Sequence, residues 1–354
     1  MKTTLQRRGG KQIPPFGRND KADLWAPICA IAGAAVWAGM AVLARMGIAR
    51  VGGIELLFLF APLVIVPLGM ELSRVIAETN ALHELARRLQ PFGAALAAVA
   101  IWLPPGRRAG LFAIGWFVVC GLMAGSGMVG LVRGPWLDSD RRVRATRVVV
   151  DIARFDLVVG GAWLVASRGG MRPIGIQEPI GLLTAVHFHF AGFATAMIGA
   201  ATVRFAERGG AQHKWLRRLV LMVAVLPVVV AAGFVISPVV KMGAAVLFSA
   251  SVAGLAIEVR AYGRKAHNAT ARIFLQVAAG AIFMGMVLSG AYAVADYMGS
   301  DALTIPEMAR THGILNAVGF CLAGLLGWLV ETHTHTAVTD EHSFQTEVEG
   351  EPVH

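Results

Sequence analysis

The chain has 354 residues, of which 56 % are apolar and only 15 % are charged, and its mean hydropathy is +0.62. Soluble domains carry about a quarter charged residues, so this composition excludes a soluble enzyme, a disordered regulator and a secreted disulfide scaffold. Continuous apolar runs approach the roughly 20 residues that cross a bilayer as a helix, whereas the strands of a porin-type barrel alternate. We therefore predict an all-α fold, a polytopic integral membrane helix bundle.

The net charge of +10 could suggest a nucleic-acid partner. The basic residues, however, lie between the apolar runs, as they do in the cytoplasmic loops of membrane proteins. We therefore expect the lipid bilayer as the partner of this surface and no nucleic acid. The cysteines Cys29, Cys120 and Cys321 lie inside apolar runs without metal-ligand spacing, which indicates small core residues.

The apolar runs predict about ten spans with both termini in the cytoplasm. Lys and Arg gather in alternate loops, such as 133–147 and 204–218, and this bias sets the orientation. Three regions follow: a basic cytoplasmic segment at 1–23, a transmembrane helical domain at 24–330, and an acidic cytoplasmic tail at 331–354 that we expect to be disordered. The expected spans are 24–44, 54–72, 91–104, 109–132, 148–167, 180–203, 219–236, 239–259, 271–295 and 306–330.

The sixth span carries two histidines, His187 and His189, in the run LTAVHFHFAGF. Ionisable residues inside a membrane are costly, so each is a candidate site residue. On a regular helix the two rings point about 160° apart, so they cannot both ligate one metal ion. Either at least one imidazole is functional, or both are packed histidines with satisfied hydrogen bonds.

Asp156 lies near the middle of the fifth span, and its helical neighbours offer no opposite charge. Its partner must come from another helix, or the carboxyl group stays protonated. Either state suits proton handling, and the alternative is a structural buried acid. Asp151 and Arg154, at spacing i,i+3 nearer the cytoplasmic end, can pair with each other.

His312 and Asn316 share one face of the tenth span at spacing i,i+4, either as site residues or as a bond between helices. Glu55, Glu178 and Tyr292 stand near the outer ends of their spans. The predicted orientation places these residues and the sixth-span histidines in the outer half. We therefore predict a polar cavity there, with Asp156 near its floor and with Glu55, Glu178, Tyr292 and Asn316 as substrate-binding residues.

Standard catalytic motifs are absent from the sequence. It contains no His-Glu-x-x-His, no P-loop, no Gly-x-Ser-x-Gly and no Asp-rich pair for magnesium diphosphate. The residue pattern thus leaves the cofactor, and any metal bound by the histidines, open.

Several of these segments resemble the YndJ-like family of bacterial membrane proteins. The resemblance is carried by LTAVHFHFAGF at 183–193, by GGAWL at 160–164, by the AP…VPL pattern within 54–68, and by HG…NAVGF at 312–320. It covers most of residues 24–330. It implies a multi-pass helical membrane protein and assigns no particular reaction.

We predict a transporter or permease of the bacterial inner (cytoplasmic) membrane, in which His187 or His189, His312 and Asp156 handle protons or bind a small polar substrate. The alternative is a membrane enzyme that acts on a lipid or isoprenoid by histidine acid–base or metal chemistry. A third possibility is a haem protein with His312 and one sixth-span histidine as axial ligands.

Overall fold

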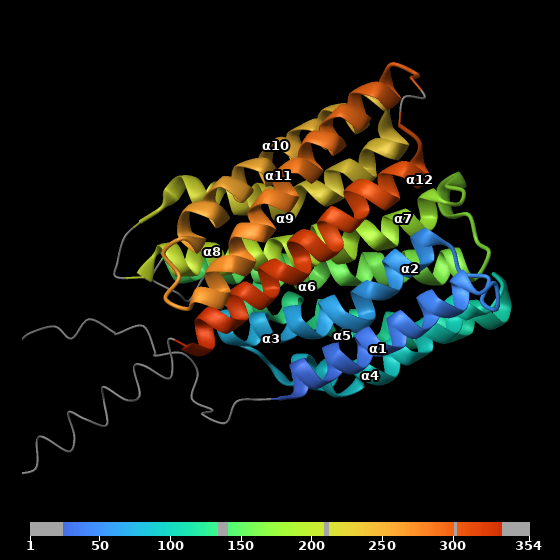
Figure 1. Cartoon of the computed structure of the whole chain (residues 1–354), viewed down its shortest axis with the longest axis horizontal. Coiled ribbons are helices and arrows are strands. Elements are labelled where there is room, and N and C mark those ends of the chain that lie inside the picture. The colour runs from blue at the N-terminus through green and yellow to red at the C-terminus, as the bar shows by residue number, and fades with distance from the viewer. Residues whose placement is uncertain (1–23, 134–140, 209–211, 301–302, 335–354) are drawn as a thin grey trace, which may run out of the picture.

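A computed structural model describes residues 24–133, 141–208, 212–300 and 303–334, and all regular structure within these ranges is helical. The long helices run side by side along the longest axis of the molecule (Figure 1). This confirms the predicted all-α class for the described part of the chain. The segments 1–23 and 335–354, which hold the expected N-terminal segment and most of the expected tail, lie outside the described residues.

The first half of the chain forms a helix–turn–helix series around α6, which packs against α5, α7, η3, α8 and α9. The elements are α1 (Trp25–Arg45), α2 (Gly53–Phe60), η1 (Ala61–Ile65), α3 (Val66–Ile76), α4 (Ala81–Trp102), α5 (Arg107–Arg133) and α6 (Arg141–Arg168).

The second half continues the bundle, and the pairs α9–α10 and α10–α11 pack closely. Its elements are the short η2 (Pro173–Gly175), α7 (Ile180–His187), η3 (Phe188–Ala194), α8 (Thr195–Ala206), α9 (Lys214–Ile236), α10 (Pro238–Gly263), α11 (Ala269–Tyr297), α12 (Ile305–Met308), η5 (Ala309–Gly313) and η6 (Leu315–Leu322).

Eight helices in the described ranges are long and apolar enough to cross a membrane. Two further helices, α4 and α6, match them in length and lie among them (Figure 1), but charged residues lower their hydropathy. The blue start of α1 and the red end of the last helix lie at the same end of the bundle (Figure 1). We call this the basic end, because the described helix ends with Arg133 (α5), Lys214 (α9) and Arg260 (α10) lie there.

Three long helices each contain a π-helical stretch: η1, η3, and the pair η5 and η6. In η1 the cause is visible in the sequence, because Pro67 cannot donate a backbone hydrogen bond and its ring crowds the carbonyl group four residues earlier. The stretches η1, η3 and η6 contact one another. Three interrupted helices therefore meet inside the bundle.

The helix expected at 91–104 begins ten residues earlier, at Ala81. Asn80 starts it, because its side-chain oxygen accepts hydrogen bonds from the backbone N–H groups of Leu82 (3.1 Å) and His83 (3.2 Å). One face of the extra turns packs inside the protein, since His83, Ala86 and Gln90 are all buried, whereas Leu85 and Leu89 on the other face are exposed.

The last helix runs through Thr334, four residues past the expected domain boundary at 330. Glu331 was expected in a disordered tail, yet it is fully buried. Its carboxylate contacts His267 Nδ1 at 2.8 Å and accepts the backbone N–H of Asn268 at 3.1 Å. These bonds hold the helix end against the loop between α10 and α11, so residues 331–334 belong to the helical domain.

Only Ser237 separates α9 from α10. Its hydroxyl group accepts the backbone N–H of Val240 at 3.2 Å and so starts α10. The two helices approach closely above this turn, because a Cβ atom at Gly233 would lie 2.6 Å from the Cα atom of Lys241. The two helices therefore form a tight hairpin.

Two glycines of α1 provide a matched test of the packing between α1 and η1. A Cβ atom at Gly33 would lie 2.6 Å from the carbonyl carbon of Leu63 in η1, whereas Gly39 has open space around it. Gly33→Ala should destabilise the protein by about 1–3 kcal/mol through overpacking. Gly39→Ala should be neutral or stabilising by up to about 1 kcal/mol, because alanine favours helix. Thermal unfolding in detergent checks both, and equal melting temperatures would contradict the described contact between α1 and η1.

Candidate functional site

Asp156 lies on the buried side of α6 with only 1 % of its surface exposed. Neither carboxyl oxygen has a hydrogen-bond partner among the described residues. The side chain packs against the backbone of η3, where a Cβ atom at Gly192 would lie 2.7 Å from Oδ2. A glycine in the π-helical stretch therefore makes room for a buried, unpaired acid near the middle of α6.

His189 lies one helical turn away on the same interface, because a Cβ atom at Gly160 of α6 would lie 2.6 Å from its Nδ1 atom. The ring is fully buried. Its Nε2 atom accepts the indole N–H of Trp116 at 2.9 Å, and its Nδ1 atom donates to the carbonyl group of Ala185 at 2.7 Å. An indole can only donate and a carbonyl can only accept, so these partners require a neutral ring with its proton on Nδ1.

His187 points the other way, as the helical spacing predicts: it is exposed, whereas His189 is not. Its Nδ1 atom donates to the carbonyl group of Leu183 at 2.7 Å. No hydrogen bond of its Nε2 atom is found among the described residues. Of the two sixth-span imidazoles, His187 is therefore the one with an available nitrogen.

His312 and Asn316 share one face, as expected from their spacing. The amide nitrogen of Asn316 lies 2.9 Å from Nε2 of His312, and Nδ1 of His312 donates to the carbonyl group of Gly285 in α11 at 2.9 Å. The two rings of His187 and His312 lie close enough to influence each other electrostatically. The hydrogen bond of His312 thus joins the last helix to α11.

The carboxylates of Glu55 and Glu178 lie near a buried arginine instead of the histidines. Both Glu55 and Glu178 act electrostatically on Arg168, whose guanidinium donates to the carbonyl groups of Ala100 (3.1 Å) and Leu103 (2.6 Å) at the end of α4. Glu178 also accepts the backbone N–H of Leu182 at 3.2 Å. These residues hold the ends of α4, α6 and α7 together.

Tyr292 stands apart from this group. It is half-buried on α11, about two turns beyond Gly285, and one turn from Asp296, which forms an ion pair with Lys241 at 2.7 Å. The structure brings it to neither the histidines nor Arg168 by any described hydrogen bond.

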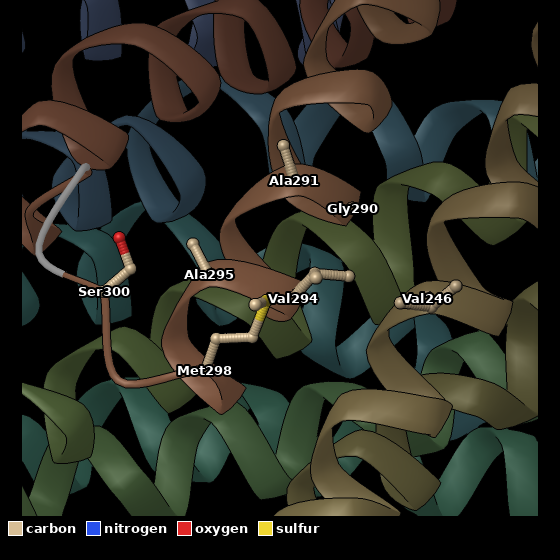
Figure 2. A pocket seen from close by; sticks show the side chains of 7 residues that line it. All are labelled: Val246, Gly290, Ala291, Val294, Ala295, Met298 and Ser300. Atoms are coloured by element: carbon tan, nitrogen blue, oxygen red, sulfur yellow. The ribbon is translucent and has the colours of Figure 1, made fainter.

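A groove of about 690 Å³ opens between α10 and α11, near the end of α11 that carries Tyr292 (Figure 2). None of the candidate site residues lines it, and apart from the Ser300 hydroxyl its lining side chains are apolar or glycine. It is therefore not the predicted polar cavity. The lining residues are Val246, Gly290, Ala291, Val294, Ala295, Met298 and Ser300.

The ligand chemistry of the histidines is limited by these bonds. Both ring nitrogens of His189 and of His312 are engaged in hydrogen bonds, so neither offers a lone pair without breaking one. Among the described residues, no group of three or more His, Cys, Asp or Glu side chains could hold a metal ion.

A second polar cluster lies toward the basic end, where the predicted pairing of Asp151 with Arg154 is confirmed and is joined by residues that the sequence did not indicate. Arg154 is 1 % exposed and donates to Asp151 Oδ1 (3.0 Å), to Ser73 Oγ (3.1 Å) and to the carbonyl group of Glu78 (3.2 Å). The fully buried His83 of α4 lies within the reach of its charge. The available signal was the pair of glycines on α5, Gly127 and Gly130, that receives this side of α6, but glycine spacing alone does not name its partner.

The comparisons with known proteins agree with this fold. A model of a protein family described as YndJ-like protein matches residues 56–320, which include Asp156, the sixth-span histidines and His312. The chain is 24 % identical over 196 residues to the "Uncharacterized membrane protein YndJ" of Bacillus subtilis (strain 168), a match that covers 55 % of this chain and 35 % of that protein. The aligned part thus spans about a third of the curated relative's length.

No solved structure matches the chain. The family model, in contrast, covers most of the chain, including the π-helical spans and α6 with its buried acid. This multi-pass helical membrane protein belongs to the YndJ-like family.

Proposed function

We propose that this protein is an inner-membrane transporter in which Asp156 binds and releases protons at the centre of the bundle, alone or together with a small polar substrate. The observation that carries the proposal is the carboxyl group of Asp156, buried without a partner against Gly192. An unpaired charge in such surroundings costs several kcal/mol. Protonation and deprotonation of the Asp156 carboxyl group are therefore coupled to a change in the polarity of its surroundings.

The backbone beside Asp156 supports such a change. Its contact helix is interrupted by η3, which meets η1 and η6. π-Helical stretches are frequent at functional sites, and transporters build their midplane sites from interrupted helices. The three helices have less regular hydrogen bonding at their meeting point than at their ends, which favours local rearrangement there.

The proposed topology has ten spans, with α4 and α6 added to the eight apolar helices, and both termini in the cytoplasm. The pattern of Lys and Arg supports this orientation, as does the common end of the first and last described helices (Figure 1). His187 and the His312–Asn316 pair then lie in the outer half and form the approach to Asp156 from outside. Glu55, Glu178 and Tyr292 stand nearer the outer surface as substrate-binding groups.

The first test is proton flux into proteoliposomes that contain a trapped pH-sensitive dye. Asp156→Asn keeps the size of the side chain and removes its proton exchange, so flux driven by a pH gradient should fall by at least about tenfold. The matched control is Glu258→Gln, which removes a half-buried carboxylate from α10, away from Asp156, and it should conduct normally. Wild-type protein no faster than empty vesicles, or an Asp156→Asn variant as fast as wild type, would overturn the proposal.

The neighbouring histidines should separate transport from stability. His189→Ala orphans the buried donor of Trp116 and the carbonyl group of Ala185 and leaves a cavity, so it should destabilise the protein by about 2–4 kcal/mol. His187→Ala removes a ring from the proposed proton approach, so it should lower the flux. Because that ring is exposed, the melting temperature in detergent should stay unchanged. If His187→Ala were instead the destabilising variant, the assignment of the two rings would be wrong.

A further inference from the structure

Four buried polar side chains gather where α4, α5 and α6 meet near the basic end: His83, Ser126, Asp151 and Arg154. His83 and Ser126 are fully buried, and Asp151 and Arg154 are 1 % exposed. In the part of the chain that the structure describes, both ring nitrogens of His83, the hydroxyl group of Ser126, Oδ2 of Asp151 and Nε of Arg154 have no hydrogen-bond partner. Buried polar groups are rarely left unpaired, so this concentration at one junction requires an explanation.

Backbone contacts hold the members of this cluster together. Asn80 accepts the backbone N–H of His83 at 3.2 Å, and its amide group donates to the carbonyl oxygen of Ser126 at 3.1 Å. The next residue of α5, Gly127, lies against α6, where a Cβ atom would be 3.1 Å from Cβ of Arg154. The three helices therefore bring the residues that carry the unpaired groups to one junction.

The charges around His83 balance one another. The arginines that act on its ring are Arg74 of α3, Arg87 of α4 and Arg154 of α6. Each is paired with an acid three residues earlier on its own helix, namely Glu71, Glu84 and Asp151 respectively. The ring thus has charged but paired surroundings, and because it is fully buried, its less costly form is the neutral imidazole with one N–H donor and one acceptor nitrogen.

We propose that His83 is a proton-relay residue that connects the basic end of the bundle with Asp156. This inference rests on the proposed function, because it needs Asp156 to exchange protons. A proton bonds to the acceptor nitrogen of the ring while the N–H bond on the other nitrogen breaks, and the released proton passes toward Ser126 Oγ and Asp151 Oδ2. The ring gains one proton and loses one, so no charge accumulates and no co-reactant is consumed.

The onward path follows α6. Asp151 precedes Asp156 by five residues, a rise of about 7.5 Å along the helix. Asp156 in turn contacts Gly192 of η3. His189 contacts α6 one turn further along, at Gly160. Asp151 and Asp156 therefore lie at two successive levels of α6, between the basic end and the level of His189.

The experiment measures proton flux in proteoliposomes for His83→Ala, with and without free imidazole in the buffer. The truncation should lower the flux by at least about tenfold, and imidazole, which fits the space of the missing ring, should restore it. His83→Gln fills that space, so its flux should also fall but should not recover with imidazole. The matched control is His213→Ala at the same end, where the ring contacts the Tyr262 hydroxyl group at 3.2 Å; it should conduct normally and ignore imidazole.

The outcomes separate the two proposals. A purely structural role for His83 would lower the melting temperature and leave imidazole without effect, and this result overturns the relay. Wild-type flux in both His83 variants, with Asp156→Asn inactive, also overturns the relay and leaves the proposed function standing. Wild-type flux in Asp156→Asn overturns the proposed function and the relay with it. If His83→Ala does not fold, His83→Gln replaces it, with His213→Ala as the control. Lower flux than the control at an unchanged melting temperature then supports the relay, and equal flux overturns it.

Discussion

Burying ionisable groups in an apolar bundle is the constraint on which the rest of the structure depends. The central helix α6 carries Asp151, Arg154, Asp156 and Arg168, all buried, and its neighbours are shaped around them. Glycines of α5 and η3 make room for the acids. Carbonyl groups just after α3 and at the end of α4 accept hydrogen bonds from the arginines. Of these four groups, Asp156 has neither an ion pair nor a hydrogen bond among the described residues, which separates it from the paired Asp151, Arg154 and Arg168.

The π-helical stretches convert this arrangement into a candidate site. His189 uses the carbonyl group of Ala185, and Thr195 donates to the carbonyl group of Phe190 at 2.9 Å, so polar side chains satisfy backbone groups around the irregular stretch. Asp156 meets the same stretch at Gly192. A buried acid and an interrupted helix are thus neighbours, and both properties are typical of sites where a membrane protein handles an ion.

The sequence predicts the helical class, most helix positions and the opposite directions of His187 and His189, because hydropathy and helical periodicity are local properties. The same local rules place a helix start at Pro91 instead of Asn80 and leave Glu331 in a tail, since neither the depth of His83 nor the pairing of Glu331 with His267 can be read from one segment. The π-helical stretches are also missed: Pro67 marks η1 in the sequence, but η3, η5 and η6 contain no proline that would mark their irregular backbone. Asp156 is found because the absence of nearby charge is itself visible in the sequence.

The single-residue connection at Ser237 has a mechanical consequence. With Gly233 pressed against the backbone of Lys241, α9 and α10 have no slack to slide or separate, so they can tilt only as one body. The ion pair of Lys241 with Asp296 extends this body to α11. A rearrangement around Asp156 would then move the interrupted helices relative to the rigid unit of α9, α10 and α11. The displacement would be concentrated at the π-helical stretches.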